Sequence, residues 1–315
     1  MSPCASPEPA AGAGAPLRTV LRPSFPVDLR LSLGPAQRGG GDPSMRIGRG
    51  EVWRAVGTPL GPVTMHLTEV REGIEVEAWG PGAPWAMEVA PATVGLLDDP
   101  GGFAPQHRVL RELHHRLPGL RIVRTATLLE SLVAVVLEQR WTSIESRRAW
   151  ARLVRGLGEP APGPPQLRLT VPAAPRRLAT TPWWAFHPFG IERRRAEVLG
   201  AIALHARHLT TILELPLDAA RERLLALPGV GPWTAAQVAL IALGDADAVP
   251  VGDYHIPDLV SWALAGEARG DDARMLALLE PYAGHRGRVL RLLGAGGIHA
   301  PRYGPPMPAR DIAAI

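Results

Sequence analysis

Lysine and asparagine do not occur in this sequence of 315 residues, and cysteine occurs once, as Cys4. Without lysine, no side-chain amine can form a Schiff base or act as an amine nucleophile. A single cysteine excludes an internal disulfide framework, a cysteine-ligated zinc site and a four-cysteine iron–sulfur cluster. This cysteine usage fits a reducing compartment, so we expect a cytoplasmic protein.

Apolar runs of membrane-spanning length are absent too, so we expect no membrane partner. Residues 1–16 lack the charged start and the apolar stretch of a signal peptide. They are rich in proline, alanine and glycine without a period, which predicts a disordered leader.

Because lysine is absent, all 34 basic residues are arginine, and the sequence pI is about 10.1. A basic balance favours an anionic partner, and the planar guanidinium group can bind two phosphate oxygens. A GC-rich genome that replaces lysine by arginine would explain most of the same bias. Composition alone therefore does not decide whether the partner is a nucleic acid.

Residues 17 to about 90 read as short strands separated by glycine and proline, which predicts a small antiparallel sheet. The predicted strands include "FPVDLRLSLG" (25–34), "EVWRAVGT" (51–58), "GPVTMHLTEV" (61–70) and "GIEVEAWG" (73–80). Two predicted helices, "PATVGLLDDP" (91–100) and "QHRVLRELHHRL" (106–117), could cover one face of that sheet.

From Pro118 onward the pattern becomes helical. The segments "TLLE" (127–130) and "TSIE" (142–145) read as capping boxes, so they predict two helices joined by a tight turn at 138–141. Further helices are expected over 191–209 and 216–227, and at about 257–265, 272–280 and 285–293. The sequence therefore predicts an α+β chain, with a helical region after a small sheet domain.

The segment "LPGVGPWTA" (227–235) predicts a turn between two helix-like stretches at 217–227 and 233–243. Gly229 and Gly231 permit a positive φ and close backbone approach. Free backbone N–H groups at the start of the second helix would bind phosphate without reading sequence. The alternative is a plain helix–helix turn with no ligand.

A single carboxylate follows in "VPVGDYHIP", where Asp253 stands just before a predicted helix with Pro257 in its first turn. Taken alone, Asp253 is an ordinary helix N-cap. The two roles are compatible, because an aspartate that caps a helix can also face a groove.

"LPGVGPWTA" followed by "GDYHI" resembles the helix–hairpin–helix DNA glycosylases with a Gly/Pro-rich loop and a catalytic aspartate. "LLESLVAVVLEQRWT", "RLPGL" and "GIERRRAEVL" are similar to segments of the alkylation-repair branch, and the β-rich start is similar to its extra N-terminal domain. The closest resemblance is to the DNA-3-methyladenine glycosylase II family. It covers about residues 20–295 and is strongest over 118–265.

The resemblance implies that Asp253 stabilises an oxocarbenium-like sugar and directs water to C1′. Bifunctional members of the superfamily carry lysine at the position of Trp233, so tryptophan here implies a monofunctional enzyme without Lys-dependent strand cleavage. The resemblance places Trp233, Gln237 and Tyr254 in the substrate pocket, where an indole face attracts a cationic alkylated purine. Trp233 as a core residue is the alternative, and Gln237 leaves the lesion open.

The resemblance also implies a set of DNA contacts. Arg140 occupies the position of the intercalating residue beside Gln139, although a solvated turn arginine is the alternative. The expected contacts are Gln139, Arg140, Gly229, Val230, Gly231 and Thr234. Main-chain carbonyls of Leu225, Leu227 and Val230 are expected to hold a monovalent cation; we expect no other cofactor and no iron–sulfur cluster.

We therefore expect a disordered leader (1–16), an N-terminal α+β domain (17–117), a two-lobed helix–hairpin–helix glycosylase domain with a cleft between its lobes (118–300), and a tail (301–315). The expected protein is a bacterial, nucleoid-associated monomer that hydrolyses alkylated purines such as 3-methyladenine and 7-methylguanine from damaged double-stranded DNA. The alternatives are a glycosylase for hypoxanthine or uracil, and a non-catalytic helix–hairpin–helix DNA-binding protein.

Overall fold

The computed structural model describes residues 14–139 and 142–301 of the chain. Arg140, nearly all of the predicted leader and the predicted tail beyond residue 301 lie outside the described residues. Within the part of the chain that is described, no helix combines the length and the apolarity needed to cross a membrane.

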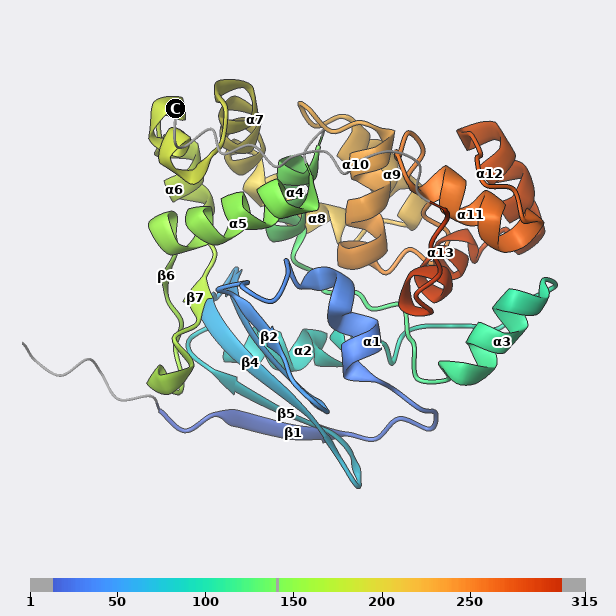
Figure 1. The fold of residues 1–315 in the computed structure, drawn as a ribbon. Helices are drawn as coiled ribbons and strands as arrows, with labels where there is room; N and C mark the ends of the chain where they lie inside the picture. The colour runs from blue at the N-terminus through green and yellow to red at the C-terminus, as the bar shows by residue number, and fades with distance from the viewer. Residues whose placement is uncertain (1–13, 140–141, 302–315) are drawn as a thin grey trace, which may run out of the picture.

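A five-stranded antiparallel sheet forms one layer of the molecule, with the strand order β1-β5-β4-β3-β2 (Figure 1). The strands are β1 (Leu17–Leu21), β2 (Met45–Ile47), β3 (Glu51–Thr58), β4 (Gly61–Val70) and β5 (Gly73–Trp79). The predictions for β3, β4 and β5 are confirmed to within one residue. Alternate residues of these strands face the same core, among them Val52, Val63 and Val76, all fully buried.

Residues 25–34 do not form the predicted strand. Leu29–Leu33 is a short helix, α1, and Asp28 caps it by accepting a hydrogen bond from the backbone N–H of Leu31 at 2.8 Å. The apolar residues of this segment fit a strand by alternation, but Leu29 and Leu33 also stand one helical turn apart, and both are fully buried. The cap at Asp28 favours the helix.

Helix α2 (Ala83–Thr93) covers one face of the sheet and contacts β1, β4 and β5. The prediction of a helix at 91–100 is wrong, because the helix lies mainly before that segment and the chain turns at Gly95 with a φ of 82°. The buried side of α2 carries Ala86 and Ala90, whose small side chains let the helix approach the strands closely.

Helix α3 (Arg108–Arg116) forms where it was predicted, but it does not cover the sheet. Leu110 and Leu113 belong to a core formed with α11 (Ile256–Ala265), α12 (Asp272–Leu279) and α13 (Arg286–Ala295). Their i, i+3 spacing predicted a buried helix face but carried no information about which layer would cover it.

The remaining helical core is built around α4, most of whose residues are buried. Its members are α4 (Leu128–Glu138), α5 (Ser143–Leu157), α6 (Pro175–Thr180), α7 (Arg193–Leu204), α8 (Ala206–Ile212), α9 (Leu217–Leu225) and α10 (Pro232–Val238). A short pair of strands, β6 (Glu159–Pro160) and β7 (Thr170–Val171), follows α5.

Helix α4 begins at Leu128 as predicted, but the predicted capping box at 127–130 does not form. The guanidinium group of Arg54 in β3 instead donates to Thr127 Oγ1 at 2.7 Å and to Glu130 Oε1 at 3.0 Å. A buried arginine on the neighbouring sheet therefore takes both side chains that the box needed. The second predicted box is confirmed at the start of α5, between Thr142 and Glu145.

Helix α10 continues as a π-helix, Ala239–Leu243. The wider spiral changes the intrahelical pairing, and the carbonyl oxygens of Ile241 and Ala242 accept hydrogen bonds from the N–H groups of Thr125 and Ala126, each at 3.1 Å. The base of the predicted DNA-binding hairpin is thus attached to the segment that leads into α4.

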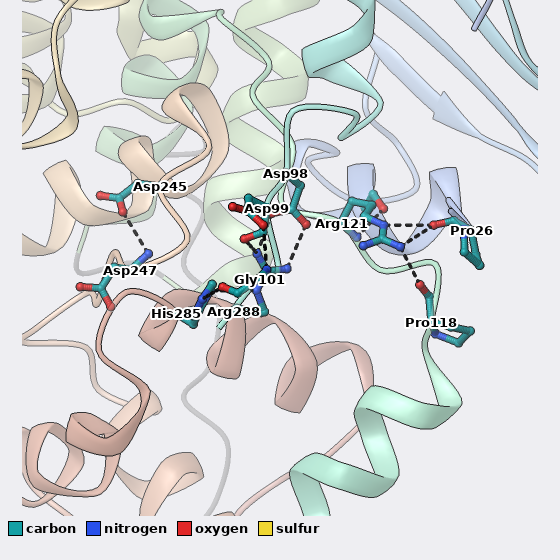
Figure 2. Close-up of polar contacts among 11 residues, drawn as sticks. Pro26, Asp98, Asp99, Gly101, Pro118, Arg121, Asp245, Asp247, His285 and Arg288 are labelled. Atoms are coloured by element: carbon teal, nitrogen blue, oxygen red, sulfur yellow. Dashed lines mark hydrogen bonds and ion pairs between the residues drawn. The ribbon is translucent and has the colours of Figure 1, made fainter. Parts of the chain in front are cut away.

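Figure 2 shows where the sheet half of the chain meets the C-terminal helices. Arg288 of α13 binds both carboxylate oxygens of Asp98, at 2.6 and 2.9 Å, and each side chain is 3% exposed. Nearby, Arg121 donates to the carbonyl oxygens of Pro26 at 3.0 Å and Pro118 at 3.2 Å. These bonds fix the sheet against the helices that carry the candidate site.

Candidate active site

The predicted hairpin forms, with α9 and α10 joined by a turn at 228–231 that we call the hairpin turn. Gly229 has a φ of 75°, and a Cβ atom built there would lie 2.7 Å from Cγ1 of Val198 in α7. Both the backbone conformation and the contact with α7 therefore require glycine. Gly231 is extended and caps α10, and Pro232 takes the first helical position, where no N–H is needed.

The backbone N–H groups of Gly231, Trp233 and Thr234 donate to no oxygen atom of the described chain. Gly231 and its neighbour Pro232 are exposed, so this end of α10 faces solvent. Free N–H groups at the positive end of a helix dipole favour an anion. The turn therefore has the geometry of a phosphate site that reads no sequence.

Side chains of the hairpin are used inside the protein rather than at its surface. Val230 and Thr234 are 6% and 2% exposed, so only their backbone remains for the predicted DNA contacts. Gln139, at the end of α4, donates through Nε2 to the carbonyl oxygen of Gly229 at 3.0 Å and to Thr234 Oγ1 at 2.9 Å. The side-chain amide of Gln139 thus attaches the end of α4 to the hairpin turn.

Arg195, in the run Arg193–Arg195 at the start of α7, holds the end of α4 in place, a role that the sequence analysis did not identify. It is 6% exposed, donates to the carbonyl oxygen of Gln139 and pairs with Glu192 at 3.2 Å. The signal was present, because Arg195 shares helical spacing with the buried Leu199 and Ile202.

Asp253 lies in the loop before α11 and accepts three hydrogen bonds. Oδ1 accepts from the backbone N–H groups of His255 at 2.8 Å and Ile256 at 3.0 Å, while Oδ2 accepts from Trp233 Nε1 at 2.7 Å. Asp253 therefore holds N–H groups at the start of α11, as a capping residue would, although the N-cap position itself is His255. It also accepts a hydrogen bond from the hairpin. The loop is itself held by Asp272, whose carboxylate accepts from the N–H of Gly252 at 3.0 Å.

The bond between Trp233 and Asp253 joins the two motifs on which the sequence analysis depended. Trp233 is half-buried and packs against the helical core, so its indole ring is fixed in position. Its N–H group holds one carboxylate oxygen, while two backbone N–H groups hold the other. A fixed anion beside a helix end that favours phosphate is suited to stabilise positive charge that develops on a bound sugar.

The two other predicted pocket residues occupy different environments. Gln237 is half-buried one turn after Trp233 on α10, so both side chains leave the same side of the helix. Tyr254 is 84% exposed, and its ring meets that of His255 edge-on at 4.9 Å. The structure therefore brings Trp233 to Asp253 directly and leaves Tyr254 in solvent at the same loop.

The carbonyl oxygens of Leu225, Leu227 and Val230 stand at the end of α9 and in the turn, where the helix dipole favours a cation. Leu227 O accepts one hydrogen bond, from Val230 N at 3.2 Å, which leaves a second lone pair. Oxygen ligands of this kind fit a hard monovalent cation. In the part of the chain that is described, no cluster of three or more His, Cys, Asp or Glu side chains could hold a metal.

Comparison with known proteins supports the resemblance seen in the motifs. No family model matches the chain. Two curated proteins of Mycobacterium tuberculosis strains, each named as a probable bifunctional transcriptional activator and DNA repair enzyme AlkA, are 33% identical over 150 residues. That match covers 47% of this chain and 29% of each relative, so the chain matches under a third of the length of these proteins.

Solved structures show the fold. A 3-methyladenine DNA glycosylase from Archaeoglobus fulgidus superposes with a TM-score of 0.74 at 18% identity, covering 88% of this chain and 97% of that one. An 8-oxoguanine glycosylase/lyase from Clostridium acetobutylicum gives a TM-score of 0.66 at 14% identity, covering 90% of this chain and 98% of that one. The predicted α+β fold of the helix–hairpin–helix glycosylases, with a small N-terminal antiparallel sheet, is therefore confirmed.

Proposed function

We propose that this chain, which has the fold of the helix–hairpin–helix DNA glycosylases, is a monofunctional enzyme that releases alkylated purines from duplex DNA. The observation that carries the proposal is the hydrogen bond of 2.7 Å from Trp233 Nε1 to Asp253 Oδ2. It places an indole ring and an oriented carboxylate beside the hairpin turn, as the reaction requires. The partial similarity to proteins named as a DNA repair enzyme supports the same class.

Binding begins at the DNA backbone in this proposal. The free N–H groups of the hairpin turn hold a phosphate, and the carbonyl oxygens of Leu225, Leu227 and Val230 would hold a monovalent cation that adds positive charge there. The target nucleotide must leave the base stack before its sugar can reach Asp253. Arg140 is proposed to fill the resulting gap, and it lies outside the described residues.

The chemistry asks little of the leaving group. An alkylated purine such as 3-methyladenine or 7-methylguanine carries a positive charge in the nucleoside, and the indole face of Trp233 attracts that charge. The N-glycosidic bond breaks with its electron pair going to the base, which departs neutral and leaves an oxocarbenium-like sugar. Asp253 stabilises that cation, and water adds to C1′ and loses a proton, so that an abasic sugar results.

Strand cleavage through a covalent amine is not part of this proposal. The resemblance implies that Trp233 stands where lyases of the superfamily carry lysine, and the sequence contains no lysine at all. Water is therefore the nucleophile, and the product is an intact strand with an abasic site.

Gln237 favours a second candidate substrate. Its side-chain amide can both donate and accept a hydrogen bond, and it lies one turn from Trp233 on the same side of α10. Such a group suits a neutral base with a carbonyl oxygen, such as hypoxanthine or uracil. The two substrate classes are separated by the released base.

The test is release of free base from methylated duplex DNA by the wild type and by Asp253→Asn, with strand breaks measured before and after hot alkali. We expect methylated purines from the wild type only, breaks only after alkali, and equal DNA binding by both proteins. Equal base release by Asp253→Asn would contradict the proposed role of this carboxylate. Binding without release of any methylated or deaminated base would instead identify a non-catalytic DNA-binding protein.

A further inference from the structure

An arginine- and tryptophan-rich surface lies where α6 packs against α7, and the proposed reaction does not use it. Its six residues are all exposed: Arg176, Arg177, Trp183, Trp184, Arg193 and Arg194. The two tryptophans belong to a 3₁₀ segment, Trp183–Phe189, that connects the two helices. We call this group the α6–α7 surface.

Positive charge on this surface is mostly unbalanced. Arg193 pairs with Glu197 at 2.7 Å, and its guanidinium group lies 5.0 Å from the ring centroid of Trp183. Within the described ranges, Arg176, Arg177 and Arg194 have no carboxylate partner at salt-bridge distance. Three free guanidinium groups on one surface favour an anionic partner.

The tryptophans distinguish this surface from a merely solvated basic face. Trp183 and Trp184 are 43% and 62% exposed, although a large aromatic side chain is usually well covered. Trp183 is fixed beneath Arg193, so the apolar and the cationic groups are presented together. Aromatic rings interleaved with arginines fit the sugars and phosphates of a nucleic-acid backbone.

The position of the surface decides which nucleic acid it would meet. Val198 of α7 lies against Gly229 of the hairpin turn, and Arg194 stands one helical turn before Val198, about 6 Å along the helix. Arg195 binds the carbonyl oxygen of Gln139, beside the predicted intercalating turn. In Figure 1, α7 lies at the edge of the molecule that faces away from the sheet, and it contacts α4, which in turn contacts α10.

We propose that the α6–α7 surface binds the backbone of the same DNA duplex, beyond the phosphates held by the hairpin turn. This proposal rests on the proposed function, because the hairpin turn must contact DNA for the neighbouring surface to meet it. The arginines hold phosphates and the indoles pack against deoxyribose, so the contact extends the footprint without reading bases. An acidic protein would meet the same charges, but continuity with the hairpin turn favours DNA.

The test is a charge reversal with a matched control. Arg177→Glu/Arg194→Glu changes the surface. The control, Arg22→Glu/Arg71→Glu, changes the net charge equally at exposed positions just after β1 and in the turn between β4 and β5. Binding is measured to a duplex centred on an abasic site, and to the same duplex extended on both sides by about one helical turn, roughly 10 base pairs. Salt dependence and single-turnover base release are measured on the same samples.

We expect the first variant to lose about tenfold in affinity for the long duplex. The slope of the logarithm of affinity against the logarithm of salt concentration should fall in magnitude by about 2, because each lost phosphate contact contributes about 0.9. Its affinity for the short duplex and its rate at saturating DNA should equal those of the control. Trp184→Ala should show a smaller loss, also on the long duplex only. Equal effects of the two double variants, or equal losses on both duplexes, would overturn the proposal.

These outcomes are separate from failure of the proposed function. If the wild type releases no base, but the surface variant still loses affinity only for the long duplex, the proposal for the α6–α7 surface stands and the glycosylase proposal is refuted. A wild type that binds neither duplex would refute both proposals. Full binding by all variants together with normal base release would support the glycosylase proposal and refute the proposal for the α6–α7 surface.

Discussion

Asp253 combines the two roles that the sequence analysis described as compatible. Its Oδ1 satisfies N–H groups at the start of α11, and its Oδ2 is held by Trp233 from the hairpin. A carboxylate held by both oxygens cannot turn away when a cationic sugar forms nearby. The capping bonds therefore contribute to orientation at the site as well as to the stability of the helix.

The contribution of the indole N–H can be isolated with Trp233→Phe, which keeps an aromatic ring but removes the donor. Because a hydrogen bond to a charged group is worth about 1.5–3 kcal/mol, we expect the single-turnover rate to fall by about 10- to 100-fold. DNA affinity should be unchanged, since the phosphate-binding N–H groups remain. Trp262→Phe on α11 serves as the control. An unchanged rate in Trp233→Phe would show that Asp253 needs no orientation from the hairpin.

Individual residues show which features of the site could be predicted from the sequence and which could not. Trp233 and Asp253 were each recognisable from their motifs, but they are 20 positions apart, and no periodicity predicts a contact between a helix and a distant loop. Thr127 and Glu130 have the spacing of a capping box and yet bind Arg54, from a strand more than 70 positions earlier. Local patterns identify candidate groups, whereas tertiary contacts decide which partner each group takes.

Among the secondary elements, the hairpin follows most closely from local chemistry. Gly229, Gly231 and Pro232 fix the turn and the start of α10 through φ, extended backbone and a dispensable N–H. The segment at 25–34 shows the opposite case, because its leucines satisfy a strand and a helix equally. The N-cap residue Asp28 decides in favour of the helix there, and the alternation of polar and apolar residues gives no indication of such a cap.

Replacement by alanine is expected to lower stability at one glycine of the turn and DNA affinity at the other. Gly229→Ala must adopt a positive φ against Val198, so we expect a loss of about 1–2 kcal/mol in the free energy of unfolding. Gly231 has an extended φ, and no atom lies within 4 Å of an added Cβ. Gly231→Ala should therefore keep its stability and lose DNA affinity, because the added methyl group stands in open space at the turn where the phosphate is proposed to bind.

Chemical denaturation and duplex binding, measured on both variants, check this prediction. The two proteins serve as controls for each other, since the substitution is the same and only the environment differs. Equal stability of the two variants would contradict the strain at Gly229. Full DNA affinity of Gly231→Ala would place the phosphate elsewhere.

At the scale of the whole molecule, buried and half-buried ion pairs join parts of the chain that belong to different layers. The C-terminal helix α13 carries two of them, Arg288 to Asp98, which Figure 2 shows, and Arg286 to Asp247. Composition indicated an excess of arginine but not its use. Several arginines that suggested a nucleic-acid partner instead hold the layers together, so the charge count overstated the surface available to DNA.

The pair between Asp247 and Arg286 predicts a dependence of stability on pH. Burial alone would raise the pKa of Asp247, but hydrogen bonds from the side chain and backbone of Arg286 outweigh it and hold the pKa below its ordinary value. The stabilisation is therefore complete above the unfolded pKa of about 3.9 and is lost as the pH falls through the lower folded value. Because the pair is partly exposed, we expect at most about 1 kcal/mol.

Urea denaturation of the wild type and Asp247→Asn, from pH 7 down to pH 3, measures this contribution. The difference between the two proteins should be constant at neutral pH and should shrink only at the acid end. A difference that grows on acidification would have the wrong sign for a depressed carboxyl pKa.

Asp98→Ala tests the junction itself. It leaves the guanidinium group of Arg288 buried without its counter-ion, so we expect a loss of about 3–5 kcal/mol in the free energy of unfolding. Glu112→Ala, which breaks an exposed pair with Arg108, should have a much smaller effect and controls for loss of a carboxylate. Asp98→Leu/Arg288→Met should recover much of the stability, since the cost comes from an unpaired charge rather than from a missing attraction. If Asp98→Ala and the double variant were equally unstable, the cost would come from lost packing at the junction and not from an unpaired buried charge.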